Sequence, residues 1–344
     1  MSLHRPIRTN EKFVGWRGED IGNKNLHNWL HTVIDREFER EICIFHKKAL
    51  PLRTKSNNHI IEYMFAINHC TVTPVRQEPS EGSEQLTQLL FGEVCEVLDR
   101  LPRWTKIRST LDGQEGWVDF KMLSPAPISS QEVKGERLKA PQNAVGIFGD
   151  PAKIKGEGVI SVPMAIATDM ETSEELMLTL GTRLPNYAHG TFEVLGKQYL
   201  INPAGVRGER REARGEEICA IAQTLLNAPY LWGGKNAMGM DCSGFTQVVY
   251  AAMGVNLLRN AREQMTQGEL VPSLAEAQPG DLAFFDHADR DPNATNISHV
   301  GLLLSPAEII HCSGCVHIDT IDEQGIHLPD GELTHHLVQI KRYL

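Results

Sequence analysis

Hydrophobic positions recur with a helical period near the start of the chain. Between residues 25 and 48, Leu26, Trp29, Leu30, Val33 and Ile34 recur at intervals of three and four. This spacing predicts an amphipathic helix. We therefore expect a helical N-terminal segment over residues 1–58, whose last polar stretch, 51–58, serves as a linker.

The pattern changes to short alternating stretches from about residue 59 to 125. The strands we expect there cover residues 71–75, 88–91, 94–98, 104–107 and 116–118. Several short strands separated by turn residues predict a small β-barrel. The turn Leu90-Phe-Gly-Glu93, the mid-strand Trp104 and the closing Gly116-Trp-Val118 resemble a bacterial SH3-like domain.

A second β-rich stretch follows a connector rich in proline and serine at residues 124–130. Its β-like pieces cover residues 159–162, 191–195 and 199–201. We predict a second SH3-like barrel over residues 131–205, so that one or two barrels precede the rest of the chain.

From residue 209 to 344 the pattern mixes helices and strands. A helix is expected at 216–226, and Phe245, Val248, Val249 and Ala252 predict another that stops at Gly254. Apolar runs predict strands at 282–285, 298–304 and 308–312. The fold class that we expect is therefore α+β.

Cys242 falls at the start of the second of these helices, with Asp241 or Ser243 available as the N-cap. A helix N-terminus carries partial positive charge, which lowers the pKa of a thiol toward the thiolate. Its exposed N–H groups also stabilise the oxyanion that forms when a thiolate attacks a carbonyl. On this local pattern alone, a buried structural cysteine is an equally good interpretation.

Two downstream histidines favour the catalytic interpretation. His299 and His311 each lie on a predicted strand beyond Cys242. A helix-borne cysteine, then a strand-borne histidine, then a polar group that orients the histidine is the order used by papain-like cysteine hydrolases.

The motifs around these residues closely resemble the NlpC family of cell-wall cysteine peptidases. The matching motifs are Pro229-Tyr-Leu-Trp-Gly-Gly234, Asp241-Cys-Ser-Gly-Phe245, Gln278-Pro-Gly-Asp-Leu282, Ser298-His-Val-Gly301 and Ile310-His311. The resemblance implies a papain-like catalytic domain over residues 209–344. It implies Cys242 as nucleophile, His299 as base and His311 as the orienting third member, with Tyr230 shaping the oxyanion site.

The preceding barrels make the chain similar to the γ-D-glutamyl-L-diamino acid endopeptidase subgroup, also called dipeptidyl-peptidase VI. The resemblance implies that Glu84 of the first barrel receives the amine of an N-terminal L-Ala. It implies that Asp241 and Ser243 contact the substrate. The chain departs from the subgroup at Gln114, where a tyrosine is often found, and at Asn260-Ala261, where an Asp-Ser pair is common; Asn260 and Ala261 remain candidate substrate-binding positions.

The implied reaction is hydrolysis of the bond between γ-D-Glu and a diamino acid, mesoDAP or Lys, in peptidoglycan stem peptides. A free N-terminal L-Ala and a role in murein peptide recycling are implied with it. The alternatives are an endopeptidase that acts on intact cell wall, a thioester-forming acyltransferase, and an inert wall-binding protein on the same fold.

Composition narrows the partners and the compartment. There are 44 acidic and 34 basic residues, a formal net charge of −10, and no basic run that predicts nucleic-acid binding. No apolar run approaches the ~18–20 residues that cross a bilayer, so no membrane partner is expected. We expect a cytoplasmic enzyme, because the basic N-terminus has no apolar stretch behind it; a sequence that starts at a mature end would instead fit export.

Cysteine and histidine usage also raises the question of metals. Seven cysteines, an odd number in a long chain, predict mostly free thiols. His311, Cys312, Cys315 and His317 cluster, but we expect Gly314 to interrupt the strand that carries them, and no second Cys/His pair at zinc-finger spacing accompanies them. We therefore expect no metal and no cofactor, and the oligomeric state is left open.

Overall fold

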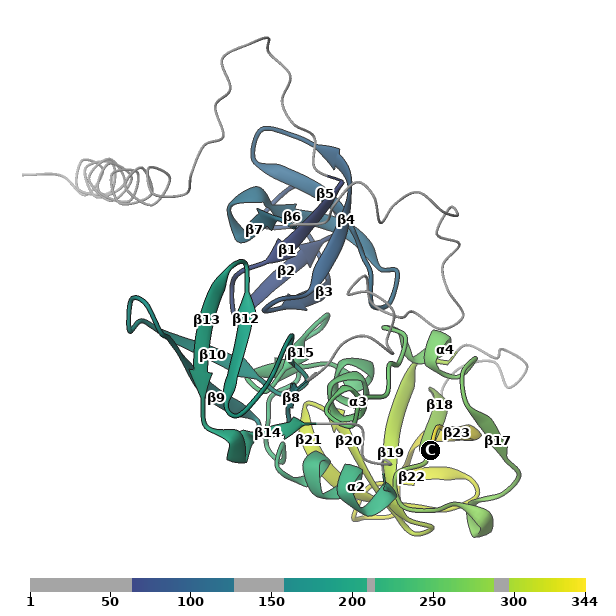
Figure 1. Cartoon of the computed structure of the whole chain (residues 1–344). Coiled ribbons are helices and arrows are strands. Elements are labelled where there is room, and N and C mark those ends of the chain that lie inside the picture. Colours follow the sequence, from purple (N-terminus) through teal and green to yellow (C-terminus); the bar gives the residue numbers. More distant parts are fainter. Residues whose placement is uncertain (1–63, 127–157, 209–213, 288–296) are drawn as a thin grey trace, which may run out of the picture. The chain divides into compact units, whose positions relative to one another are not determined.

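A computed structural model describes residues 64–126, 158–208, 214–287 and 297–344 (Figure 1). The predicted helical segment over residues 1–58 lies outside the described residues. So does the connector between the two β-rich stretches, apart from residues 124–126.

The first β-rich stretch forms a seven-stranded antiparallel sheet in the order β3-β2-β6-β5-β4-β1-β7. Its strands are β1 (Phe65–Asn68), β2 (Val72–Arg76), β3 (Gln85–Leu90), β4 (Val94–Arg100), β5 (Trp104–Ser109), β6 (Glu115–Asp119) and β7 (Leu123–Pro125), with a short 3₁₀ turn, η1 (Phe120–Met122). Each of the five predicted strands is present. Alternating side chains point into a core that contains Val75, Leu89, Ile107 and Val118.

The second β-rich stretch forms two small sheets, ordered β10-β9-β13-β12 and β11-β8-β14. Its elements are β8 (Gly158–Ile160), β9 (Met164–Asp169), β10 (Glu175–Thr179), β11 (Arg183–Leu184), β12 (Thr191–Val194), β13 (Lys197–Ile201), η2 (Pro203–Gly205) and β14 (Val206–Gly208). Its core continues into the first sheet: Phe91 packs edge-on against Tyr199, whose ring stacks on Phe192. Whether it is a second SH3-like barrel stays a prediction.

The C-terminal part is built on a second seven-stranded antiparallel sheet, ordered β17-β23-β18-β19-β20-β21-β22, in which β22 also pairs with β23. Its strands are β17 (Glu269–Val271), β18 (Leu282–His287), β19 (His299–Ser305), β20 (Glu308–Ser313), β21 (Cys315–Ile321), β22 (Gly325–His327) and β23 (Leu333–Arg342). The small ladder of β15 (Lys235–Asn236) and β16 (Gly239–Met240) and the 3₁₀ turn η3 (Leu274–Glu276) complete it.

Three helices accompany this sheet: α2 (Gly215–Gln223), α3 (Cys242–Ala251) and α4 (Ala261–Gln264). Phe245, Val248 and Val249 of α3 are buried in one core with Val300 of β19 and Ile310 of β20. The predicted α+β class is therefore confirmed, and α3 lies directly against the two strands that carry the predicted histidines. Among the described residues, no helix is both long and apolar enough to span a membrane.

Candidate active site

Cys242 is the first residue of α3, as predicted. Asp241 is the N-cap, and its Oδ1 accepts a hydrogen bond of 2.7 Å from the Gly244 N–H. A Cβ at Gly244 would lie 2.1 Å from the Gly234 carbonyl oxygen. Only glycine therefore lets the first turn of α3 approach the 228–234 loop this closely.

The acidity of the Cys242 thiol differs from the sequence expectation. Burial, followed by the negative charge of Asp241, raises the pKa of Cys242 to about 12. The N–H groups of Val300 and Ser243 and the charge of Arg259 act in the opposite direction but are outweighed. The helix N-terminus alone therefore does not produce a thiolate. Burial destabilises the charged form of the sulfur by more free energy than the helix N-terminus contributes to stabilising it.

His299 and His311 lie on adjacent strands, β19 and β20, and contact each other directly. His299 Nε2 is 2.8 Å from His311 Nδ1, and the two rings are nearly perpendicular. The Val300 N–H that acts on the Cys242 thiol follows His299 in the chain, which places the sulfur beside the start of β19. The structure thus brings together the three residues predicted to be catalytic, and their roles stay a prediction.

Two further residues extend this array: His317, which the sequence raised only as a possible metal ligand, and Asp319, which the sequence analysis missed. His311 Nε2 and His317 Nε2 are each 3.1 Å from Asp319 Oδ2. Gly314 has a φ of +74° and turns β20 into β21, so that His317 lies opposite His311 in the register and Asp319 follows on the same face. The signal in the sequence was the alternation of His317 and Asp319 after the interrupting glycine.

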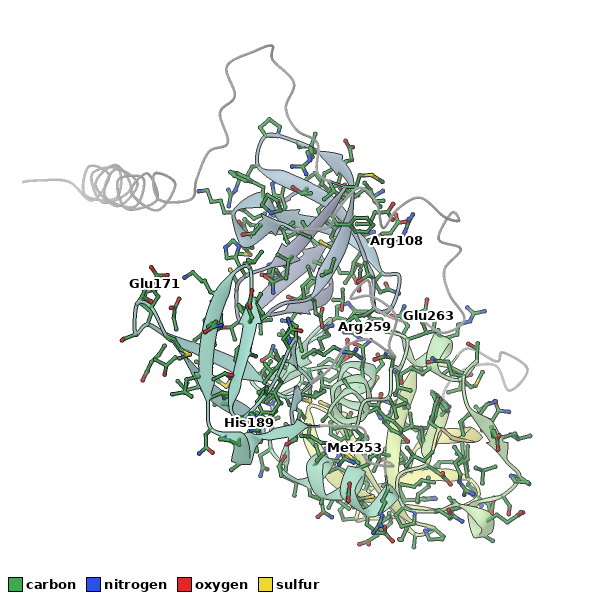
Figure 2. The ribbon with its side chains drawn as sticks, viewed as in Figure 1. Arg108, Glu171, His189, Met253, Arg259 and Glu263 are labelled. Atoms are coloured by element: carbon green, nitrogen blue, oxygen red, sulfur yellow. The ribbon has the colours of Figure 1, made fainter. Side chains whose placement is uncertain are left out.

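Arg259 is a further residue that the sequence analysis did not identify (Figure 2). It is 1% exposed, and it holds Asp241 through two bonds, Nη1 to Oδ1 at 2.9 Å and Nη2 to Oδ2 at 2.7 Å. Nη1 also donates to Ser243 Oγ at 3.0 Å. Asp241 and Ser243 are buried and engaged by Arg259, so the structure gives these side chains a supporting role, and their predicted contact with substrate stays a prediction.

Tyr230 lies in the loop that precedes β15 and packs against the core around Cys242. A parallel bridge to Met240 and a 2.9 Å bond from its N–H to the Gly314 carbonyl hold the backbone of Tyr230 in place. Burial, followed by the charges of Cys242 and Asp241, raises the pKa of the Tyr230 phenol above its usual value. The phenol therefore stays protonated and can donate a hydrogen bond to an oxyanion.

Glu84 lies just ahead of β3 and contacts the catalytic domain through Trp232. Its Oε1 accepts a bond of 2.8 Å from Trp232 Nε1, and Gln85 Nε2 donates to the Trp232 carbonyl at 3.1 Å. Glu84 is exposed. The barrel thus presents this carboxylate beside the 228–234 loop, where Trp232 follows Tyr230 by two positions in the sequence.

The carboxylate of Glu263 accepts a hydrogen bond from each of the two places at which the chain departs from the subgroup. Gln114 Nε2 lies 3.2 Å from Glu263 Oε2, and Asn260 Nδ2 lies 3.0 Å from the same oxygen. Asn260 is exposed at the start of α4, whereas Ala261 is 7% exposed. The amide of Asn260 is therefore directed to Glu263, and its contact with substrate stays a prediction.

His335 is half-buried and lies against the ring of His299. Its ring centroid lies 4.4 Å from that of His299, with an angle of 33° between the planes. β23 pairs with β18, and this pairing turns half-buried His335 toward the base. His336, the next residue, is exposed.

The six cysteines that the structure describes are all free thiols: Cys70, Cys95, Cys219, Cys242, Cys312 and Cys315. Among the described residues, the possible ligand atoms that converge belong to His311, His317 and Asp319, all within 4.8 Å of one another. The set that the sequence raised for zinc contained Cys312 and Cys315 instead of Asp319.

Comparisons with known proteins agree with this geometry. The model of the NlpC/P60 family matches residues 227–331, and that of the bacterial SH3 domain matches residues 71–124. A γ-D-glutamyl-L-lysine dipeptidyl-peptidase of Bacillus subtilis is 27% identical over 238 residues, which cover 65% of this chain and 71% of that protein. Dipeptidyl-peptidase 6 of Lysinibacillus sphaericus is 25% identical over 254 residues, 72% of this chain and 88% of that protein.

A solved structure of an NlpC/P60 family protein has a similar fold. The crystal structure of an NlpC/P60 family protein from Bacillus cereus superposes with a TM-score of 0.65 at 20% identity, covering 81% of this chain and 99% of that one. This likeness confirms the predicted fold, with an SH3-like domain ahead of the catalytic sheet. The chain therefore carries an NlpC/P60 cysteine peptidase domain preceded by a bacterial SH3 domain.

Proposed function

We propose that the chain hydrolyses the amide bond between γ-D-Glu and the following diamino acid, meso-diaminopimelate or Lys, in peptides derived from peptidoglycan. The names of the relatives from Bacillus subtilis and Lysinibacillus sphaericus support this substrate class. The observation that carries the proposal is Cys242 at the N-terminus of α3, beside the hydrogen-bonded pair of His299 and His311.

The residues support an acyl-transfer reaction in two halves. His299 takes the thiol proton as the sulfur attacks the carbonyl carbon, and the N–H groups at the start of α3, with the phenol of Tyr230, stabilise the oxyanion. The C–N bond then breaks, His299 returns the proton to the departing amine, and a thioester remains on Cys242. Water, deprotonated by His299, attacks the thioester and releases the carboxylic acid and the thiol.

The reaction is tested with the tripeptide L-Ala-γ-D-Glu-mesoDAP and with its L-Lys analogue, each followed by mass spectrometry. The dipeptide L-Ala-D-Glu and the free diamino acid are the expected products. Cys242→Ala and His299→Ala should abolish turnover, whereas Cys219→Ala, which removes another buried thiol, should retain it. Turnover by Cys242→Ala would overturn the proposal, and a new amide formed with an added amine would indicate a transferase.

We also propose that the enzyme prefers peptides with a free N-terminal L-Ala. The carboxylate of Glu84 is exposed, and Oε1 is bonded to Trp232. The other oxygen, Oε2, would pair with the substrate ammonium. A charge-assisted contact of this kind contributes about 1.5–3 kcal/mol, which corresponds to roughly a ten- to hundredfold change in kcat/KM.

Acetylation of the L-Ala nitrogen should lower kcat/KM by that factor, and Glu84→Gln should lower it similarly for the free peptide. The two losses should not add, because both remove the same interaction. Glu81→Gln is the matched control, since Glu81 is on the same barrel, is exposed and pairs with Arg103 instead. Equal turnover of free and acetylated peptides would show that Glu84 does not select the amine, and would favour action on intact wall.

A preference for free peptides fits a role in murein peptide recycling in the cytoplasm, which we propose as the setting of this activity. The free thiols of the six described cysteines fit a reducing compartment. Fractionation of the source cells, with immunoblotting of each fraction, tests this location, and recovery from the wall fraction would contradict it.

A further inference from the structure

We propose that Asp319 acts through His311 to select the tautomer of His299, and so decides which ring nitrogen of His299 is the base. Asp319 is then a positioning residue, two hydrogen bonds away from the group that moves the proton. This inference rests on the proposed function, in which His299 accepts the proton of Cys242.

The ionisation of the Asp319 carboxylate determines which nitrogen of His311 carries hydrogen. The hydrogen bond from His311 lowers the pKa of Asp319 below its usual value, so the carboxylate is ionised at neutral pH and can only accept hydrogen bonds. His311 Nε2, 3.1 Å from Asp319 Oδ2, must therefore carry a hydrogen. Burial lowers the pKa of His311, so this ring is neutral and its Nδ1 has a lone pair.

The position of the hydrogen on His311 in turn determines which nitrogen of His299 donates. His299 Nε2 and His311 Nδ1 are 2.8 Å apart, so one of them donates and the other accepts. Because His311 Nδ1 has the lone pair, His299 Nε2 must donate. In neutral His299 the remaining nitrogen, Nδ1, then has a lone pair and can take the proton of the thiol.

The opposite arrangement disables the site. If His311 carried its hydrogen on Nδ1, it would donate to His299 Nε2, and the hydrogen of His299 would move to Nδ1. That nitrogen could not accept a proton from Cys242. The reversed chain would also place two acceptors, His311 Nε2 and Asp319 Oδ2, 3.1 Å apart, which is repulsive. The carboxylate therefore stabilises the competent arrangement of both rings.

His317 completes the arrangement on the outer side of Asp319. Its Nδ1 is 2.8 Å from the Cys315 carbonyl oxygen and its Nε2 is 3.1 Å from Asp319 Oδ2, two groups that can only accept. These two contacts hold the ring of His317 beside Asp319. Electrostatic interaction with His317 also lowers the pKa of His311, which disfavours a second proton on His311 that would remove the lone pair His299 needs.

The exposed fraction of the side chains increases from His311 through Asp319 to His317. The side chain of His311 is 1% exposed, that of Asp319 is 10% exposed and that of His317 is 33% exposed. His317 thus lies nearest to water, whereas the His311 ring that reaches the base is enclosed, where reversing its hydrogen bonds has the highest free-energy cost.

The first test replaces Asp319 with an isostere. In Asp319→Asn the side-chain amide can present its NH₂ group to His311 Nε2, which stabilises the reversed chain. We expect kcat for the tripeptide to fall about 10–100-fold, the usual range for a group that orients a functional histidine from behind, with KM changed less than about twofold. Asp322→Asn is the matched control: Asp322 pairs with His327 in the same sheet, and this variant should retain wild-type kcat.

A double variant separates positioning from a general structural role. His311→Asn provides a side-chain carbonyl that accepts directly from His299 Nε2, as the asparagine of papain-like enzymes does. In this background Asp319 has no tautomer to select, so adding Asp319→Asn should lower kcat less than about twofold further. A full 10–100-fold further loss would show that Asp319 supports the fold rather than the tautomer, and would overturn the inference.

A direct readout on the unaltered protein does not depend on activity. In ¹⁵N spectra of histidine-labelled protein at neutral pH, His311 should be the neutral tautomer with hydrogen on Nε2, and the Nε2 of His299 should also carry hydrogen. A His311 tautomer with hydrogen on Nδ1 would overturn the inference, even if Cys242→Ala confirms the proposed function. Loss of activity on EDTA treatment, with recovery on adding Zn²⁺, would show that His311, His317 and Asp319 hold a metal, and would also overturn it.

Discussion

Arg259 and Asp241 form a bidentate ion pair immediately behind the nucleophile, with side chains 1% and 9% exposed. All five N–H donors of Arg259 are used, because the guanidinium also reaches Ser243 Oγ, the Gly234 carbonyl and Thr87 Oγ1 of the SH3 domain. One buried side chain therefore links the cap of α3, the loop that carries Tyr230 and strand β3.

This pair predicts a large effect on stability. Arg259→Met leaves the Asp241 carboxylate buried without its partner, which should lower the free energy of unfolding by about 3–5 kcal/mol. The same change at Arg108, whose pairs with Glu96 and Glu115 are exposed at the barrel surface, should cost no more than about 1 kcal/mol. Urea denaturation measures both, and equal losses would contradict the structural role of Arg259.

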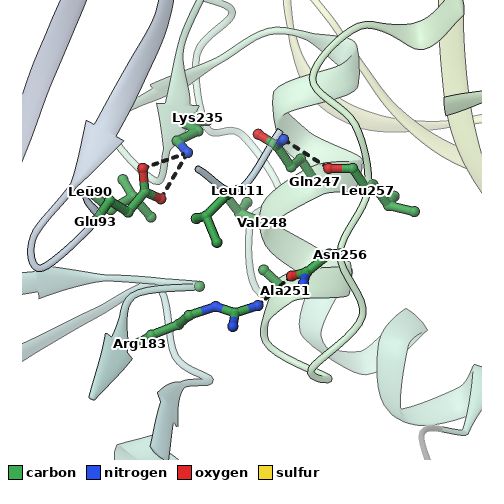
Figure 3. A pocket seen from close by; sticks show the side chains of 11 residues that line it. Leu90, Glu93, Leu111, Arg183, Lys235, Gln247, Val248, Ala251, Asn256 and Leu257 are labelled. Atoms are coloured by element: carbon green, nitrogen blue, oxygen red, sulfur yellow. Dashed lines mark hydrogen bonds and ion pairs between the residues drawn. The ribbon is translucent and has the colours of Figure 1, made fainter. Parts of the chain in front are cut away.

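A second buried pair links Glu93 and Lys235 beside a cavity of about 30 Å³ (Figure 3). Burial raises the pKa of Glu93, and Lys235 acts against this rise. In Lys235→Met the counter-charge is lost, so the pKa of Glu93 in the folded protein should rise further. An acid whose pKa is higher in the folded than in the unfolded protein destabilises the fold at pH values above the folded pKa. This destabilisation disappears below the unfolded pKa, which is 4.5 for Glu93. The stability loss in Lys235→Met should therefore be largest at neutral pH and shrink as the pH falls toward 4.5.

Thermal unfolding of Lys235→Met and wild-type protein at several pH values between 4.5 and 8 measures this difference. The double variant with Glu93→Leu removes the buried charge altogether and should recover most of the loss at neutral pH. A deficit that does not change with pH would show that Glu93 is not the group responsible.

The pKa of about 12 for Cys242 predicts how the thiol reacts without its base. In His299→Ala, alkylation of Cys242 by iodoacetamide should speed up about tenfold per pH unit from pH 7 to 10, because only the thiolate reacts and its fraction rises tenfold per unit below the pKa. Peptide mapping by mass spectrometry follows Cys242 separately from the other thiols. A plateau below pH 9 would mean that the helix N-terminus does lower the pKa of the thiol.

The ring of His335 lies against His299 and should help to hold it. A contact between rings contributes about 0.5–1.5 kcal/mol beyond burial, so His335→Ala should lower kcat by roughly two- to tenfold. His335→Phe keeps a ring at this position and should retain most of the activity. His336→Ala alters the exposed neighbour and is the control; an equal loss in His336→Ala would remove the case for His335.

Features that depend on local order along the chain can be predicted from the sequence. Asp241 followed by Cys242 and an apolar period ending at Gly254 places the nucleophile at a helix start, because capping and amphipathicity act within a few turns of chain. The strands that carry His299 and His311, and the turns of the first barrel, are set in the same local way. Gly314 was correctly predicted to interrupt the strand after His311.

The distant side chains that meet these residues are known only from the three-dimensional fold. Arg259 reaches Asp241 through the loop ahead of α4, and His335 reaches His299 through the pairing of β23 with β18. Asp319 joins His311 through the register of the β20–β21 hairpin. The pKa of Cys242 likewise depends on how much of the chain covers the sulfur. Strand pairing and burial arise from contacts between segments far apart in sequence, so local patterns identified the nucleophile and its histidines but not the groups that surround them.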